Sequence, residues 1–242
     1  MALDVRKFFQ ATNPSRTLAV ENEEDRKYYI DFSSVRGGRI IEELKENIAL
    51  WLPDEPTCDL FTGHIGCGKS TELLRLKADL EKEGFHVVYF ESSEDLEMGN
   101  VDVGDILLAI ARRVSESLEE IGISFKSGYF QNLFNEVKEV LQTPIELSTL
   151  STDVTFSVGI ASITAQAKAS PKQREKLQGF LEPRTNGIID AINQELLEPA
   201  ISKLKHQGKN GLVVIVDNLD RVDSSQKPWG RLQPEYLFVD RG

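Results

Sequence analysis

A glycine-rich segment that carries a lysine and two hydroxyl side chains is the clearest chemical signal in the sequence. It fits the pattern GxxxxGK(S/T), in which glycines let the backbone wrap closely around phosphates while successive N–H groups point inward. A helix that follows such a loop adds its positive N-terminal end. The predicted nucleotide-binding residues are Gly63, His64, Ile65, Gly66, Cys67, Gly68, Lys69, Ser70 and Thr71.

Three side chains of this loop have distinct predicted roles. Lys69 would place an ammonium charge on the β- and γ-phosphates, which makes it a candidate catalytic residue. The Ser70 hydroxyl would complete the shell of a Mg²⁺ ion that otherwise consists of phosphate oxygens and water. Thr71 would add a hydrogen bond to phosphate. The predicted ligand is a nucleoside triphosphate with magnesium, and a guanine-reading segment of the form (N/T)KxD is not apparent.

An acidic site follows an almost wholly apolar run at residues 212–216. Such a run is typical of a strand covered on both faces, and open α/β sheets bind ligands at the C-terminal ends of their strands. Asp217 is therefore predicted to hold the magnesium, mostly through a water, opposite the serine of the loop. Asn218 stands where many such enzymes carry a glutamate that activates water, so Asp220 is the candidate catalytic base. Asp220 could equally cap a following helix or pair with Arg221.

The elements that must position these residues form a strand, loop, helix and strand in succession. Residues 58–62 are a predicted strand that leads directly into the loop. Leucines at helical spacing then mark one face of a helix that ends at Gly84. A run rich in β-branched and aromatic residues at 86–90 predicts the next strand, which completes a βαβ unit.

The rest of the chain divides into predicted helices, one predicted hairpin and an arm. Apolar spacing predicts helices over residues 39–51, 105–118, 129–141 and 185–205. Alternating apolar residues predict a β-hairpin insert within residues 147–170. Residues 1–35 are polar and are expected to form an N-terminal arm with limited regular structure, and residues 36–242 are expected to form one domain.

Taken together, the loop GHIGCGKST, the strand ending DNLDR and the lead-in VRGGRIIEELKENI resemble the P-loop ATPases of the AAA-like and STAND or KAP groups. The resemblance covers about Arg36 to Arg221. It implies a three-layer α/β fold with a mainly parallel sheet and a helical insert, and an ATP-driven switch or remodelling module. Such ATPases usually complete the sheet with two more strands after the acidic strand, whereas 21 residues follow Arg221 here. We therefore expect an incomplete core that binds ATP better than it hydrolyses it.

Composition narrows the range of partners. The formal net charge is −11, with acidic residues spread along the chain, which argues against a non-specific binder of polyanions. No apolar stretch approaches the roughly 20 residues of a membrane helix and no secretory signal is apparent, so we expect a cytoplasmic protein. Two cysteines, Cys58 and Cys67, are too few for a disulfide framework and are expected to be free thiols.

Other functions stay open at the level of sequence. An ATP-dependent nucleic-acid remodeller would need basic or aromatic strand-contacting loops, which are not apparent. A non-hydrolysing nucleotide-binding fragment is consistent with Asn218 in place of a glutamate. A small-molecule kinase also fits the loop, although the acidic pair at Asp217 and Asp220 suits a switch better. A switch is expected to have a protein partner or to self-associate.

Overall fold

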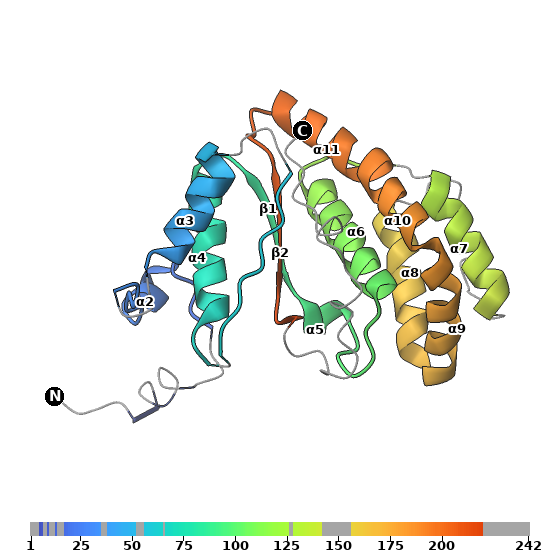
Figure 1. The fold of residues 1–242 in the computed structure, drawn as a ribbon, viewed down its shortest axis with the longest axis horizontal. Helices are drawn as coiled ribbons and strands as arrows, with labels where there is room; N and C mark the ends of the chain where they lie inside the picture. The colour runs from blue at the N-terminus through green and yellow to red at the C-terminus, as the bar shows by residue number, and fades with distance from the viewer. Residues whose placement is uncertain are drawn as a thin grey trace.

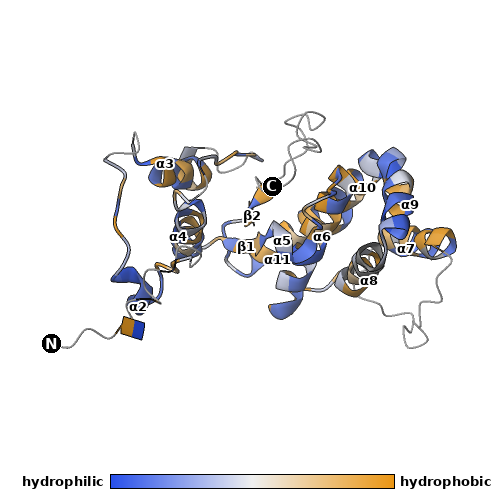
Figure 2. Ribbon diagram, turned by 90° about the horizontal axis from the view of Figure 1, so that it is seen from below, coloured by the Kyte–Doolittle hydropathy of each residue, from blue (hydrophilic) through white to orange (hydrophobic). Residues whose placement is uncertain are grey.

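The computed structural model describes residues 17–34, 38–51, 56–64, 66–125, 128–141 and 156–219, together with residues 5, 6, 9 and 13. In this part of the chain the protein is an α/β structure with a small parallel sheet. Helices lie on both sides of the sheet, as two views at right angles show (Figures 1 and 2). The predicted α/β class is therefore confirmed.

The described sheet consists of two parallel strands, β1 (His86–Glu91) and β2 (Leu212–Asp217). The register pairs His86 with Leu212 at one end and Glu91 with Asp217 at the other. Both strands were predicted from their runs of β-branched and aromatic residues, which suit strands covered on both faces. Alternate side chains point to opposite faces, so the register decides which layer each residue contacts.

One face of the sheet carries a small core beneath two helices. These are α4 (Lys69–Lys82) and α3 (Ile40–Glu46), which continues into the single-turn π-helix η1 (Asn47–Trp51). The buried side chains of this small core are Ile41, Ile48, Leu76, Leu80, Phe85, Val87, Val213 and Ile215. The predicted helices over 39–51 and after the glycine-rich loop are confirmed, because their apolar spacing matches the face that they bury.

The other face carries a large core under a stack of helices that connects β1 to β2. The stack comprises α5 (Ser92–Asp95), α6 (Val103–Glu120), α7 (Gly128–Leu141), α8 (Phe156–Ala169), α9 (Pro171–Leu181), the 3₁₀-helix η2 (Glu182–Arg184), α10 (Thr185–Ala191), the π-helix η3 (Ile192–Leu197) and α11 (Glu198–His206). The predicted helices over 105–118, 129–141 and 185–205 are confirmed. Among the described residues, no helix has the length and apolar character needed to cross a bilayer.

Local sequence explains where the elements beside the sheet start and stop. Asp102 and Asp105 form a capping box at the start of α6, which satisfies backbone N–H groups that the helix leaves unpaired. At the end of α4, the N–H of Phe85 donates to the carbonyl of Leu80, and the chain turns through Gly84 into β1. Two arginines of α6, Arg112 and Arg113, donate to the buried carboxylate of Asp95 and so hold α5 beneath the end of β1.

The predicted hairpin insert is wrong where the structure describes it. Residues 156–169 form the helix α8, and residues 142–155 lie outside the described residues. Ile160 and Ile163 are buried at helical spacing, and the alanines of this segment favour a helix intrinsically. The alternation of Val158 and Ile160 resembled a strand only over a few residues, a length at which the two periodicities are hard to separate.

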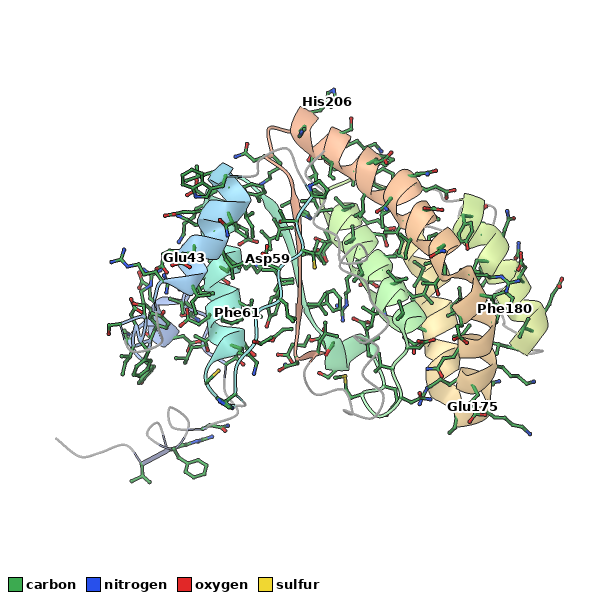
Figure 3. The ribbon with its side chains drawn as sticks, in the orientation of Figure 1. Glu43, Asp59, Phe61, Glu175, Phe180 and His206 are labelled. Atoms are coloured by element: carbon green, nitrogen blue, oxygen red, sulfur yellow. The ribbon has the colours of Figure 1, made fainter. Side chains whose placement is uncertain are left out.

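The predicted strand at residues 58–62 is also absent. In the view of Figure 3, Asp59 and Phe61 of this segment are labelled between α4 and the strands. Phe61 packs against the small core, but Leu60 is 84% exposed and Cys58 is exposed. A strand exists only through pairing, and the described part of the sheet ends at β2.

The described part of the N-terminal arm includes the short helix α2 (Glu23–Arg26), and residues 5, 6 and 9 are also helical. Asn22 caps it by accepting a hydrogen bond from the N–H of Glu24 at 2.9 Å. The carboxylate of Asp25 is buried and accepts the N–H of Ala19 at 3.1 Å, which folds the preceding residues back onto the helix. The limited regular structure that we predicted for residues 1–35 agrees with this arrangement within the described positions.

The half-buried His86 at the start of β1 predicts how stability depends on pH. Burial, followed by the charge of Lys209, lowers the pKa of His86, whose ring contacts the Ser117 hydroxyl at 2.9 Å. The folded state therefore favours the neutral ring. This contribution to stability is complete above the ordinary histidine pKa of about 6.5 and is lost as the pH falls below it.

We expect the free energy of unfolding in urea to fall between pH 7 and pH 5, and the His86→Gln variant to lose part of that slope. Equal slopes for wild type and His86→Gln would contradict this account.

Candidate functional site

The glycine-rich loop closes around the ammonium group of Lys69. The Nζ atom of Lys69 donates to the carbonyl of Gly63 at 2.9 Å and to the carbonyl of His64 at 3.3 Å. The N–H of Cys67 donates to the His64 carbonyl at 3.2 Å, which turns the chain back toward α4. The loop thus holds a positive charge at its centre, at the N-terminal end of a helix of 14 residues.

Two glycines of the loop are required by its geometry. A Cβ atom on Gly63 would lie 2.9 Å from Cys67 Sγ, closer than real side chains approach. Gly68, the residue before α4, has φ of +87°, a left-handed conformation that favours glycine. Gly63, His64 and Gly66 are exposed and Cys67 is half-buried, so the loop faces solvent. Ile65 lies outside the described residues.

The hydroxyl residues of the loop open the helix α4. Ser70 and Thr71 occupy its first turn and are half-buried. The Thr71 Oγ1 atom accepts the backbone N–H of Leu18, in the N-terminal arm, at 3.4 Å. A hydroxyl that accepts from Leu18 retains its own proton to donate elsewhere. The arm therefore contacts the loop at a residue that the sequence singled out for phosphate binding.

Asp217 lies at the end of β2 with both carboxylate oxygens engaged. Its Oδ2 atom accepts the Tyr89 hydroxyl at 2.8 Å, and its Oδ1 atom accepts the N–H of Asn218 at 2.7 Å. Burial, and then the hydrogen bond to Asp217, raises the pKa of the Tyr89 hydroxyl far above its usual range, so the hydroxyl remains a donor. Asp217 is only 2% exposed.

The described residues of the predicted site lie at one end of the molecule (Figure 1). The N-terminal end of α4 and the C-terminal ends of β1 and β2 lie at the same end, as their directions in Figure 1 show. The alternation of β2 places Asp217 on the face of Val213 and Ile215, which pack in the small core beside α4. That Asp217 holds magnesium opposite Ser70 stays a prediction.

The segment after Asp217 does not continue as a strand. Asn218 has φ of 63°, in the left-handed region that asparagine tolerates better than most residues. The choice of Asp220 as candidate base assumes an extended segment, in which Asp220 points to the same side as Asn218. The backbone is not extended at Asn218. Asp220 itself lies outside the described residues.

The arm is clasped to α4 through Arg75, a contact that the sequence analysis did not identify. Arg75 Nη1 donates to the Tyr29 hydroxyl at 2.7 Å, and the Tyr29 hydroxyl lies 3.2 Å from Glu72 Oε1. Arg75 also forms an ion pair with Glu42 of α3. Arg75, Glu72 and Glu42 also line a pocket, together with Phe61 and residues 31, 33 and 38–41. Tyrosine and arginine are ordinary hydrogen-bonding partners. This contact could not be predicted from the sequence because Tyr29 and Arg75 are far apart along the chain.

Residues that could hold a metal are few in number. Among the described residues, no group of three or more histidine, cysteine, aspartate or glutamate side chains is arranged to hold an ion. Ser70 and Asp217 supply a hydroxyl and a carboxylate, which are oxygen donors of the kind that magnesium prefers. Cys58 and Cys67 are free thiols, as the sequence predicts.

Comparisons of the chain with known proteins found no match. No protein-family model matches the chain, and neither a curated protein nor a solved structure is similar to it. The assignment of function therefore rests on the residues and their geometry.

The clasp between arm and helix predicts a measurable loss in the Tyr29→Phe variant. Burial raises the pKa of the Tyr29 hydroxyl, while its hydrogen bond with Arg75 acts in the opposite direction. Removing this hydroxyl leaves Arg75 and Glu72 without their shared partner, so we expect a loss of about 1 kcal/mol in the free energy of unfolding. Trypsin should also cleave faster after the neighbouring Lys27.

Tyr28→Phe is the matched control, because Tyr28 adjoins Tyr29 and is 52% exposed. It should leave both the unfolding free energy and the cleavage rate near wild type. Identical cleavage of the two variants would show that Tyr29 does not secure the arm.

Proposed function

We propose that this protein binds ATP with magnesium through Gly63–Thr71 and Asp217, and that the bound nucleotide acts as a switch on the packing of the N-terminal arm. The observation that carries the proposal is the closed loop around Lys69 at the N-terminal end of α4. A phosphate group needs an ammonium charge, inward N–H groups and close backbone approach. The loop supplies the ammonium charge of Lys69 and, at Gly63, the close backbone approach.

The glycine-rich segment fits a triphosphate in its steric properties as well as its charge. Gly63 lies against Cys67 Sγ where no Cβ atom has room, so the backbone approaches the centre of the loop closely. Lys69 is held by carbonyl oxygens of the loop, which phosphate oxygens are able to replace. Thr71 retains a proton for a phosphate oxygen while it accepts from Leu18.

In this proposal magnesium would be held by few protein atoms. Ser70 would donate its hydroxyl oxygen to the shell, and Asp217 would contact the ion mostly through a water. Bound magnesium would neutralise charge on the phosphates. Lys69 is the candidate catalytic residue for hydrolysis, and Asp220 remains the candidate base on sequence grounds alone.

The proposed fold is the three-layer P-loop NTPase type. Its support is the order of the layers, with α3 and α4 on one face of a parallel sheet and the helical stack on the other (Figure 2). The α6–α11 stack would be the helical insert of the proposed fold. We further propose a cytoplasmic protein with a protein partner, because a switch requires something to act on.

The first test is titration with a fluorescent ATP analogue and Mg²⁺. We expect saturable binding by the wild-type chain and a loss of at least about tenfold in affinity for Lys69→Ala, since the variant lacks the charge that meets the phosphates. Lys77→Ala is the control on the same helix, because Lys77 pairs with Glu81 at 3.0 Å, away from the loop.

Phosphate release on the same samples then separates two forms of the proposal. Turnover would identify an ATPase, and binding without turnover would identify a non-hydrolysing nucleotide sensor. Absence of analogue binding by the wild-type chain would contradict the proposed function.

A second test uses the close contact inside the loop. Gly63→Ala should weaken analogue binding roughly tenfold or more, because its Cβ atom would overlap Cys67 Sγ and displace the loop. The double variant Gly63→Ala/Cys67→Ala removes the sulfur and should recover most of the affinity. Equal weakening in the single and the double variant would refute this steric explanation.

A further inference from the structure

The contact between Tyr89 and Asp217 bears on how magnesium would be bound. This inference about magnesium rests on the function proposed above. Tyr89 is the fourth residue of β1 and Asp217 the last residue of β2, so they come from segments 128 residues apart. The Tyr89 hydroxyl donates to Asp217 Oδ2 at 2.8 Å, an ordinary distance for an O–H···O hydrogen bond. This hydrogen bond joins side chains of β1 and β2 near the C-terminal ends of the two strands, where the candidate site lies.

The register of the sheet makes this contact rigid. Tyr89 pairs with Ile215, so Asp217 follows two residues later on the same face of the neighbouring strand. The ring of Tyr89 packs against the small core, and its position is therefore fixed by the same residues that bury α4. The Tyr89 ring therefore cannot turn away without losing its packing against the small core.

A carboxylate has about four lone-pair positions, and two of those of Asp217 are engaged. Tyr89 takes one on Oδ2 and the N–H of Asn218 takes one on Oδ1. These two donors restrict rotation of the carboxylate about its bond to the chain. The remaining lone pairs are thereby held in one direction, toward whatever the carboxylate binds.

We propose that Tyr89 is a positioning residue for magnesium, which acts by orienting the Asp217 carboxylate. Outer partners of a metal-binding group typically contribute 10- to 100-fold to metal affinity. Tyr89 therefore influences the metal and leaves the contacts between the loop and the phosphates unchanged. A tyrosine with only a packing role would affect binding with and without magnesium equally.

The test compares the magnesium dependence of nucleotide binding in the full chain. The wild type and Tyr89→Phe are titrated with Mg²⁺ at a fixed concentration of the fluorescent ATP analogue, and separately with the analogue in EDTA. We expect the Mg²⁺ midpoint of Tyr89→Phe to rise roughly tenfold or more, with binding in EDTA changed by less than about twofold. Tyr129→Phe, a half-buried tyrosine of α7, is the control and should match the wild type in both.

A double-variant cycle adds a second, independent measurement. In an Asp217→Asn background the tyrosine has no carboxylate to orient, so Tyr89→Phe should cause no further shift in the Mg²⁺ midpoint. Tyr89→Met, which also removes the donor while filling the space with a flexible side chain, replaces Tyr89→Phe if that variant does not fold.

Three outcomes would overturn the inference: an unchanged Mg²⁺ midpoint in Tyr89→Phe, a lower midpoint, or equal losses with Mg²⁺ and in EDTA. These results are distinct from failure of the proposed function. In that case the wild-type chain would not bind the analogue at all, whatever the state of Tyr89.

Discussion

The parallel register of β1 and β2 is the constraint on which the rest of the structure depends. With Glu91 opposite Asp217, the side chains of both strands divide between two layers, and Asp217 falls on the side of α4. A slip of one residue would turn every side chain of a strand to the opposite face. Asp217 would then point into the helical stack, and its contact with Tyr89 would be lost. Burial on both faces makes such a slip costly.

The parts of the fold that sequence predicts well are those whose pattern is long and local. The helix spanning 103–120 repeats its apolar spacing over five turns and carries its own capping box. Runs of β-branched residues predict the two strands. Residues 156–169 misled the prediction because a short alternation has no length to distinguish it from a helix. The strand expected at 58–62 failed for a different reason, since its existence depends on a neighbour and not on its own residues.

The residues of the candidate site also differ in whether a local sequence pattern predicts them. The loop motif and Asp217 can be predicted from the sequence because their residue types and spacing indicate a specific chemistry. The role of Tyr89 cannot be predicted in this way, because a tyrosine in an apolar strand usually has only a packing role. Its contact with Asp217 follows from the register, which pairs Tyr89 with the residue two positions before Asp217 on the partner strand. The clasp of Tyr29 with Arg75 is hidden likewise, since 46 residues separate the partners. Long-range pairing is the information that a single sequence lacks.

The arm and the loop are linked through the first turns of α4, and this determines how a switch would operate. A ligand shifts an equilibrium only by contacts that differ between two states, and the resulting coupling is reciprocal. Leu18 contacts Thr71 through a long hydrogen bond, whereas Tyr29 and Arg75 are joined by a short one. Under the proposed function, the contact of Tyr29 with Arg75 would hold the arm near α4 both with and without a nucleotide in the loop. The weak contact is therefore the one whose geometry a phosphate at Thr71 would change, and the clasp keeps Leu18 close enough to respond.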